Sequence, residues 1–368
     1  MIITDIKLLN FRNYDYMLQE FSGGVNLLIG ENASGKTNLL ESIYTLANTK
    51  SFRSQNDNNL VKINTDGYYL KGNFLINSIP CSAEYSYISK VKTLKFNNDK
   101  IKKLREYIAK ILIVLYNPID LYIINESPVY RRLFINTVLC KIDVDYFVSL
   151  RSYMAILSQK KSALKMYRDG KIDYDSLEML NSRLTEFGAY IVFKRMEFFK
   201  YFTVLFREKF FLVMNREYNL EVYYRTGCVD VSNYAGGVLL ENIKNEIDKK
   251  FRDTLGNEIK LSRILAGVQQ DDVEFISNRR PVKYFFSQGE RKSMTLALKL
   301  AEIDYMRSLT GGYPIALFDD VFSELDETRQ NFLVKEIGRG FQAIIADTIF
   351  NEQFTKINSF KKIDIKPK

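Results

Sequence analysis

The chain has 368 residues, of which 46% are apolar and 26% charged, as is ordinary for a soluble, folded protein of roughly two domains. These values exclude a disordered or fibrous chain. Histidine is absent, which excludes His-based triads, general bases and metal ligands, so any hydrolytic chemistry must use carboxylates and a metal. Lys and Arg number 53 against 44 Asp and Glu, and the resulting charge of +9 favours a polyanionic partner without identifying one.

No stretch of the sequence predicts membrane insertion or export. The longest uncharged apolar runs, such as residues 111–116 and 187–193, are far shorter than the ~20 residues that cross a bilayer. The first residues lack the pattern of a signal peptide. The three cysteines, Cys81, Cys140 and Cys228, lack the spacing of a zinc site, and their odd number argues against a disulfide framework. We expect a cytoplasmic protein without a membrane partner.

Strands are predicted at both ends of the chain and helices in its middle. Short apolar runs of the length of buried strands occur at 2–9, 25–29, 315–318 and 341–346. Three runs alternate polar and apolar residues and predict an antiparallel β-subdomain: 68–76, 80–88 and 92–96. A helix is expected after Ser127 and Pro128, a polar cap followed by proline. Helical runs at 144–165 and 174–213, joined by a turn at 168–171, predict a long antiparallel hairpin.

An eight-residue motif follows the run at 25–29 and matches G-x-x-x-x-G-K-[ST], the P-loop: Gly30, Glu31, Asn32, Ala33, Ser34, Gly35, Lys36 and Thr37. In such a loop the glycines let backbone N–H groups face phosphates, Lys36 reaches the β- and γ-phosphates, and Thr37 offers its hydroxyl to Mg²⁺. The helix-favouring residues 38–43 place a positive helix terminus on the anion. We expect ATP, with Mg²⁺, to bind here.

Asp319 and Asp320 end the apolar run at 315–318 and give it the form of a Walker B strand. We expect Asp319 to hold Mg²⁺, usually through water, and Asp320 to orient or activate the attacking water. Lys36, Asp319 and Asp320 are therefore the expected catalytic residues. The alternative is an ordinary buried strand with a polar end, which the presence of a P-loop disfavours.

Ser287, Gly289 and Glu290 form a Ser-x-Gly-Glu sequence at a predicted helix start. It resembles the ABC signature motif, in which the serine hydroxyl, the glycine N–H and the helix terminus meet the γ-phosphate of a nucleotide on another subunit. A simple capped helix is the alternative. Residues 323–326, after the Walker B carboxylates, lie where the D-loop of ABC ATPases lies. We therefore expect an ATP-dependent homodimer with shared sites.

The expected fold class is α/β, with a P-loop ABC-type ATPase lobe that includes the antiparallel β-subdomain and a mainly helical second lobe. The ATPase lobe is predicted at 1–118 and 305–368. The helical lobe is predicted at 119–304, with the hairpin at about 143–213 and the signature motif. Thr348, after the last core strand, is a candidate γ-phosphate sensor in place of the switch histidine of transporter ATPases.

The whole set of motifs closely resembles the RecF family of DNA replication and repair proteins, relatives of the SMC and Rad50 ATPases. Three further strings carry the resemblance: Leu-Asn-Phe-Arg-Asn-Tyr at 9–14, Leu-Ala-Asn-Thr-Lys-Ser-Phe-Arg at 46–53 and Asp-Asp-Val-Phe-Ser-Glu-Leu-Asp at 319–326. Arg12, in the first string, is included among the nucleotide-binding residues. Residues 267–272 depart from the family's usual Gly-Pro-His-Arg-Asp-Asp, and Ile119 stands where an acidic residue is usual.

The resemblance implies a cytoplasmic recombination mediator and weak DNA-dependent ATPase. Such a protein dimerises on ATP, binds double-stranded DNA at single-strand gaps, and works with RecR and RecO to load RecA. An ABC-type transport subunit is disfavoured by the missing histidine switch and the large helical insertion. A P-loop kinase would need no signature motif, and a non-hydrolysing ATP-binding scaffold is a further alternative.

A basic run between residues 90 and 105 has seven basic residues against one acid, Asp99. Such a run suits salt-dependent contacts with phosphates, although a solvated face is the commoner explanation. The candidate DNA contacts within it are Lys92, Lys95, Lys100, Lys102, Lys103 and Arg105. A second candidate cluster lies near the hairpin tip and consists of Lys160, Lys161, Lys165 and Arg168.

Overall fold

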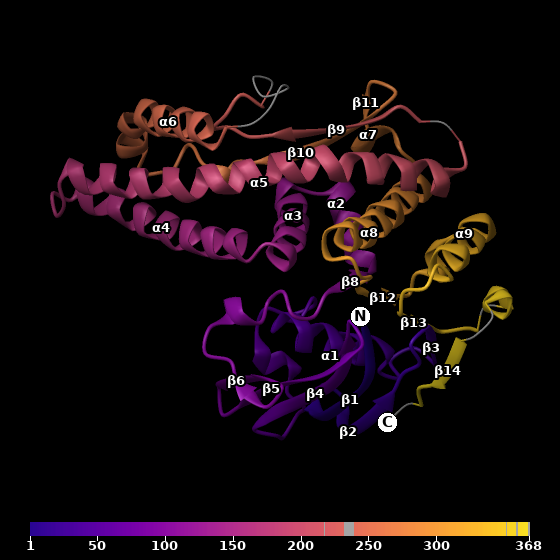
Figure 1. The fold of residues 1–368 in the computed structure, drawn as a ribbon. Helices are drawn as coiled ribbons and strands as arrows, with labels where there is room; N and C mark the ends of the chain where they lie inside the picture. Colours follow the sequence, from indigo (N-terminus) through magenta and orange to yellow (C-terminus); the bar gives the residue numbers. More distant parts are fainter. Residues whose placement is uncertain (217, 232–238, 351, 358–359, 367–368) are drawn as a thin grey trace. The chain divides into compact units, whose positions relative to one another are not determined.

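The computed structural model describes residues 1–216, 218–231, 239–350, 352–357 and 360–366, which divide into two compact units (Figure 1). The first unit comprises Met1–Leu121, Leu205–Glu217 and Phe286–Lys368. The second unit comprises Tyr122–Val204 and Tyr218–Phe285. None of the helices in these described ranges is both long and apolar enough to cross a membrane.

A parallel sheet forms the centre of the first unit. Its strands follow the order β14 (Phe360–Asp364), β3 (Val25–Ile29), β13 (Ala343–Asp347), β12 (Ile315–Asp319) and β8 (Ile113–Tyr116). The four strands from β3 to β8 are almost entirely buried, as expected for strands covered on both faces. Because all five strands are parallel, their carboxyl ends meet at one edge, where the loops that follow them can form a common site.

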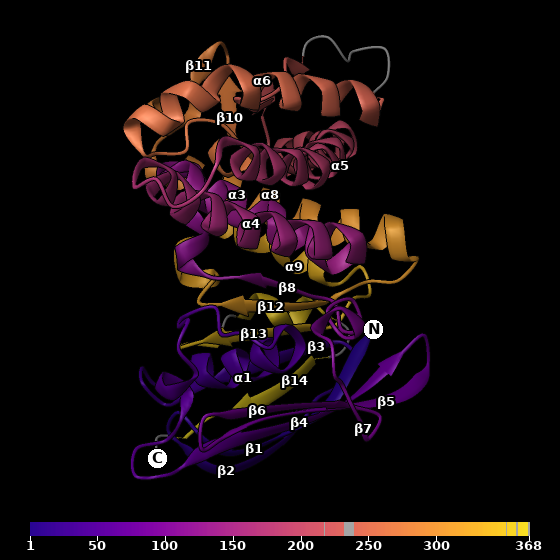
Figure 2. The same cartoon turned by 90° about the vertical axis from the view of Figure 1, so that its left-hand side faces the viewer.

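An antiparallel sheet forms the other layer of the first unit. Its order is β2 (Tyr14–Glu20), β1 (Ile2–Phe11), β4 (Gly67–Ile76), β5 (Ile79–Ile88), β6 (Val91–Phe96) and β7 (Asp99–Lys100). Helix α1 (Lys36–Asn48) lies between the two sheets (Figure 2). Its residues Leu39, Leu40 and Ile43 are fully buried in the core that both sheets share. The antiparallel β-subdomain predicted from the alternating runs is therefore present.

Helices α8 (Gln288–Thr310) and α9 (Glu327–Ile337) complete the first unit, together with the last turns of α5. Helix α8 packs against β8, and its buried Lys299 lies 3.9 Å from Asp120 in the same unit. The sequence predicted a boundary at residue 304 and placed the signature motif in the helical lobe. The contacts of α8 with β8 and with residues 118–121 instead group it with the ATPase lobe.

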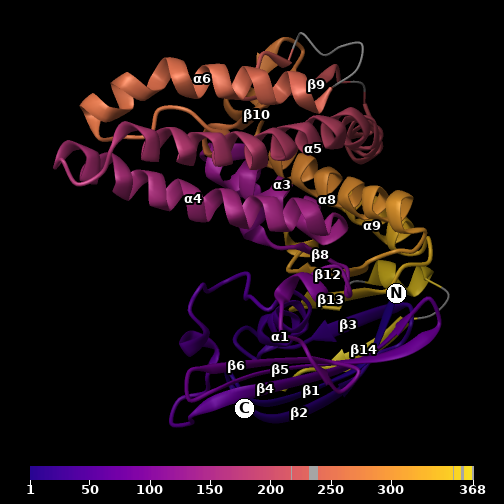
Figure 3. The ribbon, with the colours of Figure 1, turned by 60° about the vertical axis from the view of Figure 1, so that its left-hand side comes forward.

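The second unit is built on a long helical hairpin (Figure 3). Its helices are α2 (Tyr122–Asn125), α3 (Pro128–Ile142), α4 (Val144–Arg168), α5 (Tyr174–Met214, up to Val204 in this unit), α6 (Leu240–Leu261) and α7 (Val282–Phe285). Leu164 and Leu177 pack together near the hairpin turn. At the far end, Arg195 Nε of α5 donates to the hydroxyl of Tyr146 in α4, 3.1 Å away. The two helices thus run antiparallel, as their sequence pattern predicts.

A small antiparallel sheet completes the second unit, in the order β11 (Arg280–Pro281), β10 (Asp272–Ser277) and β9 (Leu220–Arg225). The residues that precede β10 are held by Arg195, which pairs with the buried Asp271 and donates to the carbonyl of Val268 at 3.0 Å. Gln269, where the family usually has histidine, accepts a hydrogen bond from Tyr153 at 2.9 Å. Arg195 and Asp271 therefore form a buried polar pair that fixes the segment 267–272.

One buried cation ties the end of α5 to the rest of the first unit. Lys209 is 2% exposed and pairs with Glu336 at 2.6 Å and with Asp304 at 2.7 Å. We expect Lys209→Met to lower the free energy of unfolding by about 3 kcal/mol, because it leaves the buried Glu336 with the half-exposed Arg339 as its remaining cation. Urea unfolding measures this. The exposed Lys200→Met on the same helix is the control and should change stability by less than about 0.5 kcal/mol.

Candidate nucleotide-binding site

The P-loop lies between β3 and α1, in the strand–loop–helix setting that the motif requires. Gly35 has φ of +111°, and a side chain there would meet the hydroxyl of Tyr14 at 2.6 Å. A side chain on Gly30 would meet the carbonyl oxygen of Ile365 at 2.3 Å. Gly35 is therefore required by its backbone conformation, and Gly30 is required by the close approach of the residue that follows β14.

Lys36 and Thr37 point in different directions from the start of α1. The ammonium of Lys36 donates to the carbonyls of Gly30 at 2.6 Å and Glu31 at 2.8 Å, so it closes the loop on itself. The hydroxyl of Thr37 donates to Asp319 Oδ1 at 2.9 Å. This bond brings together the two residues that the sequence predicted as Mg²⁺ ligands.

Three aspartates gather at the carboxyl edge of the parallel sheet. Asp319 ends β12, Asp320 follows it with φ of +53°, and Asp347 ends β13 between β12 and the P-loop strand. Burial raises the pKa of Asp319 and of Asp347 above the ordinary carboxyl value, and it lowers the pKa of Lys36 despite these nearby carboxylates. Such a cluster of desolvated, opposed charges is typical of a functional site.

Thr348 directly follows this edge. Its backbone N–H donates to Asp347 Oδ1 at 2.6 Å, which holds the residue at the end of β13. Thr348 was predicted from the sequence as a γ-phosphate sensor, whereas Asp347 was not predicted to have a role. The apolar run that ends in Asp347 has the same form as the run that ends in Asp319, and this similarity is the signal that could have identified it.

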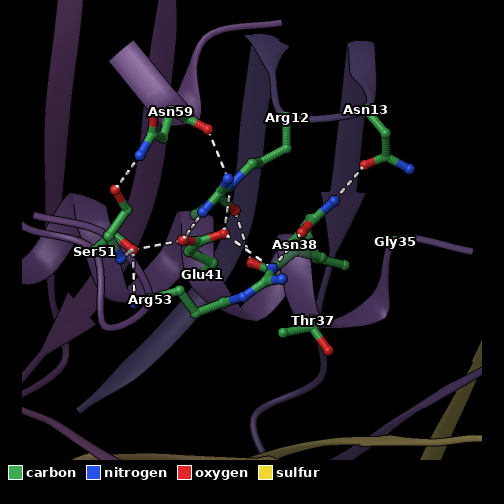
Figure 4. Close-up of polar contacts among 12 residues, drawn as sticks. Arg12, Asn13, Gly35, Thr37, Asn38, Glu41, Ser51, Arg53 and Asn59 are labelled. Carbon is green, nitrogen blue, oxygen red and sulfur yellow. Dashed lines mark hydrogen bonds and ion pairs between the residues drawn. The ribbon is translucent and has the colours of Figure 1, made fainter. Parts of the chain in front are cut away.

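A second polar cluster surrounds Glu41, one helical turn along α1 from Thr37 (Figure 4). Glu41 is fully buried there and accepts hydrogen bonds from Arg12 at 2.7 and 2.8 Å and from the hydroxyl of Ser51 at 2.5 Å. Arg53 contacts the same carboxylate at 3.5 Å and donates to Asn38 at 2.9 Å. Arg12, predicted as a nucleotide contact, is thus held by Glu41 and by the carbonyl of Asn59 at 2.6 Å.

The cluster around Glu41 brings together residues from three separate segments of the chain. Arg12 comes from the turn between β1 and β2, Glu41 from α1, and Ser51 and Arg53 from the segment after α1. Arg53 also lies close enough to Asp319 to oppose the rise in its pKa. Neither Glu41 nor Arg53 was assigned a role from sequence, because their partners are separate in the chain.

Ser287 and Gly289 lie at the start of α8. The hydroxyl of Ser287 accepts from the N–H of Glu290 at 3.3 Å, and Glu290 accepts from the N–H of Ser287 at 2.8 Å, which together form a capping box. Both Ser287 and Gly289 are exposed. The helix start is therefore well ordered and open to a ligand.

The candidate DNA contacts differ in their surroundings. Lys92 pairs with Asp57 at 2.5 Å and Lys95 with Glu84 at 3.7 Å, so part of their charge is already balanced. The remaining four are exposed on β7 and the segment after it: Lys100, Lys102, Lys103 and Arg105. In the second cluster, the prediction for Lys160 was wrong, because Lys160 is fully buried and pairs with Glu258 at 2.6 Å.

The fold and the site together define a P-loop nucleotide-binding protein of the class that includes the SMC ATPase heads. A family model described as the RecF/RecN/SMC N terminal domain matches residues 2–367. The chain belongs to the RecF family of DNA replication and repair proteins, which confirms the resemblance inferred from the motifs and makes a transport subunit untenable.

Individual relatives agree with this assignment. The DNA replication and repair protein RecF of Bacillus mycoides (strain KBAB4) is 36% identical over 349 residues, which cover 95% of this chain and 92% of the relative. The RecF of Ligilactobacillus salivarius (strain UCC118) is 36% identical, with 94% and 90% covered.

Solved structures also match. A recombination mediator protein RecF with ATP is similar at a TM-score of 0.88 and 30% identity, covering 95% of this chain and 93% of that chain. An Smc head bound to the C-winged helix domain of ScpA, at 14% identity and a TM-score of 0.58, covers 100% and 95% and shows the shared fold alone. These matches confirm the predicted α/β fold class.

Gly30→Ala tests the close approach of Ile365 to the P-loop. The added methyl must displace a backbone carbonyl, so we expect ATP to bind roughly tenfold or more weakly, measured by calorimetric titration. The control is Gly256→Ala in α6, where nothing lies within 4 Å of the new methyl. That variant should bind ATP normally and unfold at the same or a higher temperature. Normal ATP affinity in Gly30→Ala would contradict the close approach.

Proposed function

We propose that this chain is a DNA-binding ATPase that binds ATP and Mg²⁺ at the loop from Gly30 to Thr37 and dimerises when it does so. The observation that carries the proposal is the hydrogen bond between Thr37 and Asp319, because it joins the P-loop to the Walker B strand. The relatives whose solved structures are named with ATP have the same fold over nearly their whole length.

The side chains present fit a nucleotide and its metal. The hydroxyl of Ser34 is buried and has no hydrogen-bond partner within the described part of the chain, as expected of a loop residue that awaits a ligand. In this proposal, the phosphates accept hydrogen bonds from backbone N–H groups of residues 30–35, which include Glu31, Asn32 and Ala33. Lys36 would release the loop carbonyls and contact the phosphates instead. Arg12 and Thr348 remain candidate contacts to the nucleotide in this proposal, Arg12 from the turn between β1 and β2 and Thr348 from the end of β13.

The proposed metal site is small. Thr37 and Asp319 would hold Mg²⁺, which usually takes one or two protein oxygens and completes its shell with phosphates and water. A bound Mg²⁺ would neutralise charge on the phosphates. Asp320 would orient the attacking water. Its left-handed backbone turns it away from the β12 direction, and its N–H donates to the carbonyl of Ala346 at 3.0 Å, which fixes the turn.

Completion of the site needs a second copy. Ser287 and Gly289 are exposed at the start of α8, where a helix terminus favours an anion. We propose that this end meets the γ-phosphate held by the partner's P-loop, so that ATP joins the two copies. Hydrolysis would then release them, and a slow rate would give the dimer time to act.

We further propose that the dimer binds double-stranded DNA at single-strand gaps and assists RecA loading together with RecR and RecO. Two observations support this: the relatives are named as DNA replication and repair proteins, and the similar solved structures are described as recombination mediators in a RecFOR pathway. The exposed cations on and after β7 provide a surface of the charge that DNA requires.

Ser287→Asp tests the shared site. Aspartate caps a helix as well as serine does, so α8 should stay folded, but its negative charge would face the incoming γ-phosphate. We expect ATP affinity of the single copy to be unchanged and the ATP-dependent dimer to weaken by roughly tenfold or more, measured by analytical ultracentrifugation.

Ser287→Asn is the matched control, since it keeps the cap without the charge. It should dimerise much more readily than Ser287→Asp. A Ser287→Asp variant that dimerises on ATP as well as the unmodified chain would rule out the proposed contact.

The basic surface is tested by reversing three charges at once. We expect Lys100→Glu, Lys102→Glu and Lys103→Glu together to weaken duplex DNA binding by about tenfold or more and to reduce the salt dependence by about one unit for each lysine. ATP binding should not change. The control reverses three exposed lysines of α6, Lys244, Lys249 and Lys260, and so has the same net charge. Equal loss of DNA binding in both triple variants would mean that only overall charge matters.

A further inference from the structure

An exposed tip of the second unit combines cations with aromatic rings. We call residues 278–285 the β10–β11 tip; it includes the turn after β10, strand β11 and helix α7 (Figure 1). All of its residues except Val282 are exposed, and it contains no acid. Tyr284 is 75% exposed and Phe285 is 57% exposed, values unusual for rings of this size. None of the motifs described above accounts for them.

The backbone of the tip gives one arginine a costly position. Ser277 pairs with Arg280, so Asn278 and Arg279 alone form the turn. Both have left-handed backbones, with φ of 49° and 63°. Two-residue hairpin turns of this kind strongly favour Asn-Gly, because glycine adopts the second position without strain. Arginine in place of glycine adds a cation to this turn at some cost in backbone strain.

Two cations of the tip lie over its aromatic rings, and the cations of the tip are not paired with carboxylates within the described residues. The guanidinium of Arg280 lies 5.0 Å from the centre of the Phe285 ring, and the ammonium of Lys283 lies 5.8 Å from that of Tyr284. Within the described ranges of the chain, Arg279, Arg280 and Lys283 form no ion pair. Positive charge and exposed ring surface are therefore both available to a ligand.

We propose that the β10–β11 tip binds single-stranded DNA. Phosphates would contact Arg279, Arg280 and Lys283, while unpaired bases would stack on Tyr284 and Phe285. Cations interleaved with exposed rings are the chemistry of sequence-independent single-strand binding. A duplex keeps its base faces stacked inside, so it can use the charges but not the rings. A protein partner fits less well, because unbalanced cations would be buried against it.

This inference rests on the proposed DNA-binding function and gives it a second contact. The lysines on and after β7 belong to the first unit and suit a duplex backbone, whereas the tip belongs to the second unit and suits an unpaired strand. A gap in DNA offers both kinds of strand. The two surfaces can be tested separately, because their variants are far apart in the chain.

The test uses the full chain and fluorescence anisotropy at low salt, with labelled oligo-dT of about 20 nucleotides and a blunt duplex of the same length. We expect Arg279→Gly and Tyr284→Ala each to weaken oligo-dT binding by about three- to tenfold and to leave duplex binding nearly unchanged. Tyr284→Phe should retain affinity because it keeps the ring, and Tyr284→Leu should not, because it keeps only apolar surface.

Folding is controlled within the same design. Arg279→Gly places the favoured residue in the turn and should keep or raise the unfolding temperature. Ser78→Gly makes the same change in the β4–β5 turn, where Ser78 has φ of +65°, and should leave oligo-dT binding unchanged.

Unchanged oligo-dT affinity in both Arg279→Gly and Tyr284→Ala would overturn the inference. An unmodified chain that binds duplex but not oligo-dT would overturn the inference and leave the proposed function standing. An unmodified chain that binds neither DNA, with or without ATP, would overturn the proposed function itself.

Discussion

The hydrogen bond between Thr37 and Asp319 joins residues 282 positions apart, and the proposed nucleotide site depends on it. It forms because β3, near the start of the chain, pairs in parallel with β13, which pairs with β12. The long helical segment between them can vary without disturbing this edge, since both halves of the site are attached to the same sheet. The architecture thus separates a fixed site from a large insertion.

The edge of the sheet is held in an electrostatically unfavourable state. Burial disfavours the charged forms of all three groups: it raises the pKa of Asp319 and of Asp347 and lowers the pKa of Lys36. The surrounding core stabilises the fold enough to tolerate it, through fully buried residues of α1 and both sheets. A ligand that brings phosphates and a divalent cation would relieve the imbalance, which is how binding can drive a change of state.

Much of this could be predicted from sequence, because the decisive signals are local. A strand, a glycine-rich loop and a helix within 24 residues identify the P-loop, and apolar runs that end in aspartate identify the strands beside it. The helical hairpin follows from periodicity and a Gly-containing turn. Side-chain partners were not predictable in this way. Lys160 has the local sequence of a surface lysine, and only the fold brings Glu258 to it, just as only the fold brings Glu41 to Arg12. The domain boundary was misplaced for the same reason, since the packing of α8 on β8 leaves no local mark.

The central claim is that each nucleotide site is shared between two copies, with Lys36 from one and Ser287 from the other. The most direct test mixes two variants, Lys36→Ala and Ser287→Asp, and measures ATP hydrolysis. Each variant alone has a lesion in both of its sites. In a mixed dimer both lesions fall in one site, and the other site contains an intact Lys36 and an intact Ser287. We expect mixing to restore hydrolysis. The rate should reach at most about half of that of the unmodified chain, because one of the two sites in each mixed dimer is intact. Activity no higher than the sum of the separate variants, in mixtures shown to contain mixed dimers, would contradict it.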